Sequence, residues 1–216
     1  MTRTRAYLLL GPVAFVWFFA WILLLDLLRP EYTSAHKAVS ELGAIGAPHM
    51  WAMNLFGFIA TGVMLMLAAR GYRAVIPQRS RFPAAMLWLT GLLFALTAVP
   101  IAMAPDGDPD RSAPITQVHL LISQLGLLPW LIALLVLMTR FGDRAHRPLA
   151  LISLLTVVAF IGVIVLYAAG VGATTPGLMQ RLWFAVVLGW FGAAGLWLAL
   201  AQGAGARHAV VGEGRG

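Results

Sequence analysis

The sequence predicts an all-α membrane protein: a bundle of six transmembrane helices with a short amphipathic helix in the first outer loop. Of its 216 residues, 61% are hydrophobic and only 11% are charged, whereas roughly 25% are charged in a typical soluble domain. A soluble fold of this composition would expose a largely apolar surface and aggregate. The apolar residues also form long runs between short charged segments. The chain has no cysteine, which excludes thiol chemistry and thiolate metal sites.

Six apolar runs are long enough to cross a bilayer. A hydrocarbon core of roughly 30 Å requires about 20 apolar residues in a helix. The stretches that meet this requirement are residues 7–28, 49–69, 83–104, 115–138, 148–170 and 178–201. We therefore expect residues 1–202 to form a single six-helix domain. The Gly-rich segment 203–216 is predicted to be a disordered cytoplasmic tail.

The distribution of charge predicts the orientation of these spans. With six spans both termini lie on one side, and eleven of the fifteen Lys and Arg residues fall on that side, whereas six of the eight acids fall on the other. The net charges of +9 and −2 together give the overall +7. By the positive-inside rule both termini are cytoplasmic, in a multi-pass protein of the plasma (inner) membrane. No basic patch interleaved with aromatic residues lies outside the loops, so we expect membrane lipids, and no nucleic acid, as partners.

The first outer loop, residues 29–48, is long and contains a helical pattern. Ser34 is predicted to cap this helix and Gly43 to end it. One face carries an apolar stripe, and the other carries His36, Lys37, Ser40 and Glu41. Two interpretations remain open. The helix either lies at the interface with a solvated charged face and a weak Lys37–Glu41 pair, or presents His36, Ser40 or Glu41 to a cavity.

Other polar residues cluster at the same outer ends of the spans. They are Asn54 in the second span, Asp106 after the third, His119 one turn into the fourth, and Gln180 and Arg181 at the start of the sixth. Ionisable groups at membrane depth usually face the bundle interior. The alternatives are a helix–helix hydrogen bond for His119, and for Arg181 snorkelling, binding of an anionic head group, or a pair with Asp106 or Glu41. Asp26 and Arg29 are expected to form a local ion pair.

Three catalytic schemes compete for these residues. A serine nucleophile beside His119 lacks a nucleophile-elbow motif, and a zinc site lacks any HxxxH or HExxH pattern. Residues 105–111 carry alternate aspartates, but the EF-hand pattern fails at Arg111 and Gln117. General acid–base chemistry needs the fewest residues. We therefore predict no cofactor, with a divalent cation as the alternative. The predicted catalytic residues are Glu41, Asp106 and His119, and the predicted substrate-binding residues are Ser40, Asn54, Gln180 and Arg181.

Several short motifs occur in a fixed order along the chain. They are Ser40-Glu41-Leu42-Gly43-Ala44, Trp51 with Asn54, Pro105-Asp106, His119, and Pro176-Gly177-Leu178-Met179-Gln180-Arg181. Over residues 8–200 this order resembles the prokaryotic six-span membrane family known as domain of unknown function 998. The resemblance implies a bundle with these polar positions on one side and brings no established reaction. The layout also faintly resembles alkaline-ceramidase-like hydrolases, whose HxxxH pairs are missing here, and small membrane-bound terpene cyclases.

These observations predict a membrane protein that acts on a lipid or isoprenoid by general acid–base chemistry, as a cyclase or hydrolase does. Its substrate would be a hydrophobic small molecule that enters between helices. The alternative is a non-catalytic protein that binds a lipid or a partner. Transport is less favoured, because no inverted repeat is visible.

Overall fold

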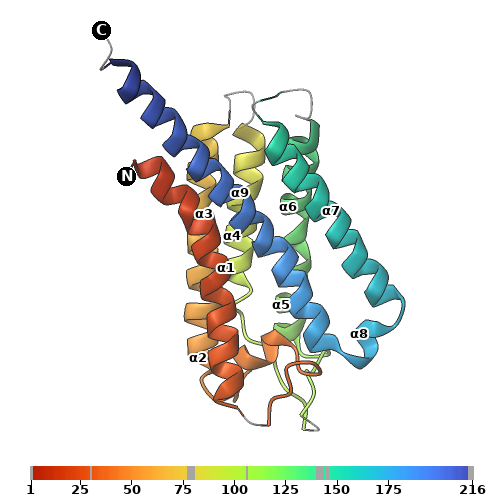
Figure 1. The fold of residues 1–216 in the computed structure, drawn as a ribbon. Helices are drawn as coiled ribbons and strands as arrows, with labels where there is room; N and C mark the ends of the chain where they lie inside the picture. Colours follow the sequence, from red (N-terminus) through yellow and green to blue (C-terminus); the bar gives the residue numbers. More distant parts are fainter. Residues whose placement is uncertain are drawn as a thin grey trace.

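The computed structural model describes residues 2–29, 31–76, 81–105, 107–139, 144 and 146–213, with side chains as far as Gln202. The described part is all-α (Figure 1), apart from one isolated bridge between Met103 and Pro109. Its elements are α1 (Arg3–Leu27), the 3-10 helix η1 (Val39–Gly43), α2 (Met50–Ala52), the π-helix η2 (Met53–Ile59), α3 (Ala60–Val75), α4 (Arg81–Leu96), α5 (Pro114–Leu125), α6 (Leu127–Met138), α7 (Arg147–Ala168), α8 (Val171–Thr174) and α9 (Pro176–Glu213).

The long helices form a closed ring. Helix α1 packs against α3 and α9, and the ring continues from α3 to α4, α6, α7 and back to α9. The start of α1, the ends of α3, α6 and α9, and the starts of α4 and α7 lie at one end of the bundle, here called the terminal end (Figure 1). The first loop, α2 and α8 lie at the opposite, loop-one end.

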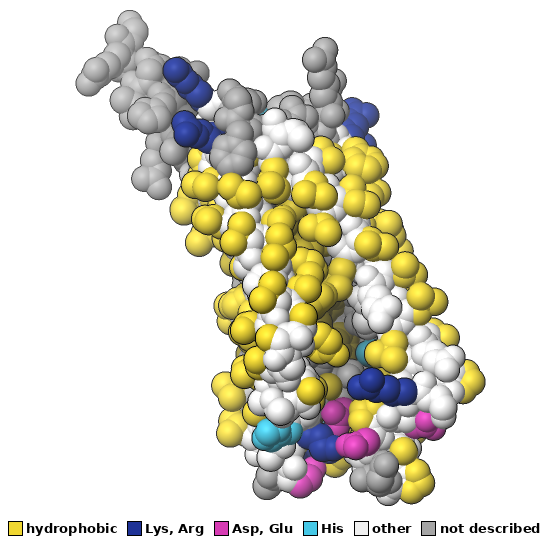
Figure 2. Space-filling view, turned by 90° about the vertical axis from the view of Figure 1, so that its right-hand side faces the viewer, with side chains coloured by type: hydrophobic (Ala, Val, Ile, Leu, Met, Phe, Trp, Pro, Cys, Tyr) yellow, Lys and Arg dark blue, Asp and Glu magenta, His cyan; other side chains and the backbone are white. Residues whose placement is uncertain are grey.

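Five helical stretches are long and apolar enough to cross a membrane: Arg3–Leu27, Met50–Val75, Pro114–Met138, Arg147–Ala168 and Pro176–Gln202. Helix α4, with 16 residues, is a shorter apolar helix. The prediction of a multi-pass α-helical membrane bundle is therefore confirmed. On the face shown in Figure 2, apolar side chains cover the middle of the molecule, while charged side chains gather at its ends. On the face shown, acidic side chains lie only at the loop-one end.

Helix α4 is shorter than the predicted span over residues 83–104. It ends at Leu96 because Pro100 has no N–H to donate and disfavours helical backbone in the residue before it. The following segment folds back across the loop-one end, where the Ala102 N–H donates to Thr116 Oγ1 over 2.9 Å. The Ile45 N–H donates to the Ile101 carbonyl over 2.9 Å, which joins this segment to loop one.

The predicted helix in loop one is also shorter than expected. A turn follows Ser34, and a five-residue 3-10 helix, η1, then runs from Val39 to the predicted last residue, Gly43. The extended backbone of Ala38, at φ −68° and ψ 149°, separates the two parts. Ser34 does not cap a helix, because its hydroxyl instead donates to Asp26 on α1. Loop one therefore folds into the mouth of the bundle.

Close backbone contacts and aromatic packing hold the ring together. A Cβ on Gly62 of α3 would clash with the backbone of Ala95, and one on Gly91 of α4 would meet the backbone of Met66, so the glycines let these helices touch. Beside this contact, four aromatic rings from α1, η2, α4 and α9 pack at centroid distances of 4.8–6.4 Å: Phe18, Phe58, Phe94 and Phe184.

The backbone of α9 continues as a helix through Glu213, into the segment for which the sequence predicts disorder. The side chains beyond Gln202 lie outside the described residues. Disorder of the cytoplasmic tail therefore stays a prediction.

Candidate functional site

Loop one is bound to the first turn of α9. The Leu178 N–H donates to the Ala35 carbonyl over 3.0 Å. A Cβ on Gly177 would clash with the carbonyl oxygens of Lys37 and Ser34, so only glycine permits this approach. The sequence motif that begins at Pro176 and Gly177 therefore serves to dock the loop on the helix.

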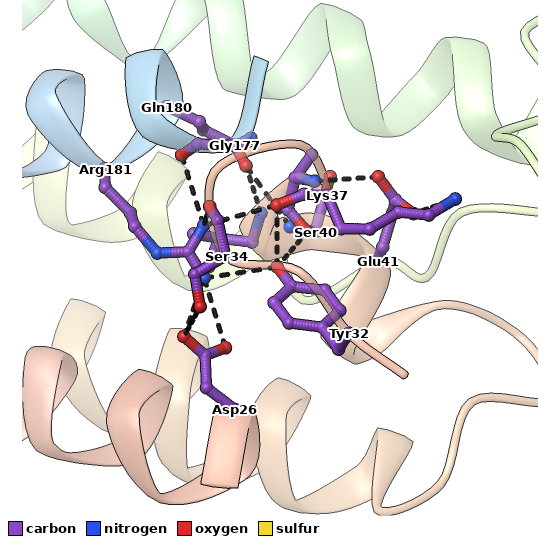
Figure 3. Close-up of polar contacts among 11 residues, drawn as sticks. Asp26, Tyr32, Ser34, Lys37, Ser40, Glu41, Gly177, Gln180 and Arg181 are labelled. Carbon is purple, nitrogen blue, oxygen red and sulfur yellow. Dashed lines mark hydrogen bonds and ion pairs between the residues drawn. The ribbon is translucent and has the colours of Figure 1, made fainter. Parts of the chain in front are cut away.

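Next to this contact, an ion pair joins α9 to α1 (Figure 3). Arg181 Nη2 of α9 lies 3.1 and 3.0 Å from the two carboxylate oxygens of Asp26 at the end of α1. Both side chains are largely buried, at 14% and 13% exposure. Ser34 donates to the same carboxylate, which satisfies a further lone pair. We call Asp26, Tyr32, Ser34 and Arg181 the loop clasp.

The guanidinium of Arg181 also donates hydrogen bonds to backbone carbonyls of loop one and of α9. Its Nη1 donates to the carbonyls of Ser34, Lys37 and Gly177 over 2.7, 3.2 and 3.1 Å. Its Nη2 lies 3.3 Å from the Tyr32 hydroxyl. A guanidinium is suited to this role because it presents several N–H donors in one plane. With these contacts made, the charge of Arg181 is neutralised inside the clasp.

Tyr32 completes the clasp from within loop one. Its hydroxyl lies 2.9 Å from the Lys37 carbonyl and 2.7 Å from the Ala38 carbonyl, and its ring is buried. Burial raises the pKa of Tyr32 to about 12 against the weaker opposing effect of Arg181, so the phenol stays protonated as a hydrogen-bond donor.

Glu41 lies in a separate hollow of about 360 Å³ at the loop-one end. Its Oε1 accepts the Ala38 N–H over 2.7 Å, and its Oε2 is 3.4 Å from Lys37 Nζ. Lys37 also donates to the Gly107 carbonyl over 3.0 Å and lies 3.4 Å from Asp108. Burial lowers the pKa of Lys37, but the charges of Glu41 and Asp108 outweigh it and raise the pKa overall. Glu41 thus caps η1 and forms the predicted pair with Lys37.

Asn54 and Gln180 also hold the loop. The buried Asn54 amide donates to the Gly43 carbonyl over 3.0 Å. Gln180 Oε1 accepts the N–H of Val39 and lies 3.4 Å from the N–H of Ser40. Because an N–H only donates, the amide oxygen must face η1 and the Gln180 NH₂ group must face the other way.

A larger cavity of about 590 Å³ lies on the other side of Gln180, inside the spanning region. It is lined by side chains of α4, α5, α7 and α9, and most of its wall is apolar. Helix α5 packs on α4 and α6, and the cavity occupies the space between α5 and the pair α7–α9. Leu120, Ile164 and Tyr167 on its rim are exposed on the membrane-facing surface. The cavity is therefore accessible from the side, where lipid would be.

His119 of α5 lies in the wall of this cavity and is 4% exposed. Its Nδ1 is 2.7 Å from the Val99 carbonyl, in the segment that follows α4. A carbonyl can only accept, so this contact keeps a proton on Nδ1 and makes the other nitrogen of the neutral ring an acceptor. The segment that follows the shortened α4 therefore supplies the carbonyl that orients the ring.

The structure therefore does not bring all the predicted site residues together in one cavity. Glu41 and His119 line different cavities, which argues against their sharing one substrate. Ser40 meets Gln180 through its backbone N–H. Asp106 lies outside the described residues. The predicted local pair is wrong: Arg29 pairs with Glu31 over 2.9 Å, whereas Asp26 pairs with Arg181.

Sequence reasoning missed the site roles of the clasp residues Tyr32 and Ser34 and of Gly177, where the loop docks on α9, and it gave Asp26 the wrong partner. The available signal was Asp26 itself, an acid in the last turn of an apolar span. Such a charge is normally paired inside the bundle, and Arg181 enters the membrane at the same end. Within the described part of the chain, no three His, Asp or Glu side chains converge as a metal site would require.

Residues 12–197 match a family of proteins of unknown function, DUF998. The chain belongs to this family. No curated protein and no solved structure matches the chain. The DUF998 match covers α1 to α9 and so includes the clasp, Glu41, His119 and the whole cavity wall.

Proposed function

We propose that this protein binds the apolar chain of a lipid or isoprenoid in the cavity between α4, α5, α7 and α9. The observation that carries the proposal is the cavity of about 590 Å³ with a mostly apolar wall in the spanning region. Its volume lies within the roughly 300–1,000 Å³ typical of ligand sites. Its rim includes exposed apolar side chains of α5 and α7, so a chain would enter sideways from the bilayer.

We further propose that the terminal end faces the cytoplasm, as the excess of basic residues there predicts. In a plasma (inner) membrane this orientation puts the cavity and the clasp in the outer leaflet. The ligand would then come from that leaflet.

Two neighbouring positions on α7 offer a matched test. Val163 is buried in the cavity wall, whereas Val165 is 59% exposed and lies outside the wall. Val163→Phe should place a phenyl ring in the cavity and obstruct it, and Val165→Phe should leave it open. We expect native mass spectrometry of detergent-purified protein to show a retained lipid on the wild type and on Val165→Phe, and none on Val163→Phe. A wild type without retained lipid, or equal retention by both variants, would contradict the proposal.

A second candidate function is catalysis on the bound chain, supported by the orientation of His119. Because Nδ1 donates to the Val99 carbonyl, the other ring nitrogen is left to accept a proton from a ligand in the cavity. Glu41 is a poorer candidate, because its two oxygens already contact the Ala38 N–H and Lys37. If the protein is an enzyme, lipid extracts of cells carrying His119→Gln should lack a product that Glu41→Gln still makes. Identical extracts from the wild type and His119→Gln would exclude this function.

A further inference from the structure

The polar groups of the cavity have an unusual composition. Among the described lining residues none is Lys, Arg, Asp or Glu. The polar side chains are hydroxyls, amides and one imidazole: Thr90, Thr97, Ser123, Gln124, Tyr167, Gln180 and His119. A ligand in the cavity therefore meets hydrogen-bonding groups but no carboxylate, ammonium or guanidinium of the described chain.

The nearest cations in the structure are turned away from the cavity. Arg181 follows Gln180 directly in the sequence, yet its guanidinium contacts Asp26, the loop-one carbonyls of Ser34 and Lys37, and the Gly177 carbonyl of α9. Lys37 precedes the lining residue Ala38, but its Nζ contacts Glu41, Asp108 and the Gly107 carbonyl. Neither cation is directed at a ligand in the cavity.

The hydrogen-bonding capacity that remains is that of a neutral site. Three lining hydroxyls donate to carbonyls of their own segment: Thr90 to Met86, Thr97 to Phe94 and Ser123 to His119. Their protons are used, but their oxygens keep lone pairs that accept. Gln180 has its amide oxygen on η1, so its NH₂ group is left as a donor for the cavity. The Gln124 amide, the Tyr167 hydroxyl and the Trp183 indole N–H in the lining are further neutral donors, so the wall presents neutral donors and several acceptors.

We propose that the head group of the bound chain is an uncharged hydroxyl, so that the ligand is a long-chain alcohol of the prenyl or acyl type rather than its phosphate. This inference rests on the proposed chain-binding function. A hydroxyl both donates and accepts one hydrogen bond, which matches the Gln180 amide and the lining oxygens. A phosphate would carry its charge into an apolar wall without a counter-charge, and an unpaired buried charge is strongly disfavoured.

A matched pair of probes tests the inference on the full-length protein in nanodiscs. Geranylgeraniol and geranylgeranyl phosphate share one chain and differ in the head group. We expect geranylgeraniol to bind at least roughly tenfold more tightly than the phosphate. Equal or tighter binding of the phosphate would overturn the inference and leave chain binding intact. Failure of both probes to bind would overturn the chain-binding proposal itself.

A charge placed in the wall provides a second, independent measurement. Gln124 of α5 lines the cavity and is exposed enough to accept a longer side chain. Gln124→Lys should tighten binding of the phosphate and narrow the preference for the alcohol, because it supplies the missing cation. The uncharged control Gln124→Met should keep the wild-type preference. If Gln124→Lys leaves the preference unchanged, the absence of charge does not determine head-group selection, and the inference is wrong.

Discussion

The loop clasp and the apolar cavity lie on opposite sides of Gln180 and differ in how their polar groups are used. In the clasp, Asp26 and Arg181 pair with each other, and the remaining donors of Arg181 go to loop carbonyls and Tyr32. In the cavity, Gln180 faces the space with its NH₂ group, and the lining hydroxyls keep free lone pairs. The charged groups that attract notice in the sequence stabilise the loop. The neutral groups beside them are available to a ligand.

Removal of the clasp cation should have the largest effect on stability. Arg181→Met leaves the largely buried Asp26 carboxylate without its partner, and such a loss costs about 3–5 kcal/mol. We expect a large drop in the melting temperature of the detergent-purified protein. The control is Arg147→Met, which removes an exposed arginine at the start of α7, at the terminal end of the bundle. It should change stability by about 0.5 kcal/mol or less. Equal melting temperatures for the two variants would show that the clasp does not hold the fold.

Removal of the Asn54 tether should have the next largest effect. Asn54→Leu keeps the branched shape of the side chain but leaves the buried Gly43 carbonyl without its donor, at a cost of about 1–3 kcal/mol. The measurement is again the melting temperature. Because Asn54 lies beside η1 and does not line the cavity, geranylgeraniol should bind the folded variant about as well as the wild type. A stable variant that has lost binding would place Asn54 in the ligand site instead.

Tyr32 provides a pH-dependent test of the clasp. Its pKa of about 12 in the folded protein lies above the ordinary value of 10, so the folded state holds the phenol proton more tightly than the unfolded state. This contribution is fully present below pH 10 and is lost as the pH rises from about 10 to 12. Wild-type stability should fall more steeply over this window than that of Tyr32→Phe. Parallel curves for the two proteins would mean that the phenol is not held in its neutral form by burial.

The Lys37 contacts should contribute least. Lys37 is 33% exposed and Asp108 is 76% exposed, so solvent screens this pair, while the 8% exposed Glu41 keeps the Ala38 N–H as a partner when Lys37 is removed. Lys37→Met should lower stability by about 0–1 kcal/mol, a loss that salt in the wild type partly reproduces. Denaturation at low and high ionic strength measures both effects. A loss as large as that of Arg181→Met would remove the distinction between the two charge clusters.

The spans were predictable from the sequence because lipid solvates any sufficiently long apolar helix alike. The end of α4 was misplaced although Pro100 marks it, since hydropathy alone continues to Ala104. The Asp26–Arg181 pair joins residues 155 positions apart, and only the ring closure of α1 on α9 brings them together. Nor could a sequence pattern show that side chains of α4, α5, α7 and α9 enclose a cavity that His119 lines.

The most direct test of the central claim compares geranylgeraniol binding by two variants in nanodiscs. Glu41→Gln alters the charged hollow, and Val163→Phe obstructs the apolar cavity with a phenyl ring. If the cavity is the ligand site, Glu41→Gln binds within about twofold of the wild type and Val163→Phe at least roughly tenfold more weakly. Strong binding by Val163→Phe together with loss of binding by Glu41→Gln would contradict the account. It would place the ligand site at the charged residues of loop one instead.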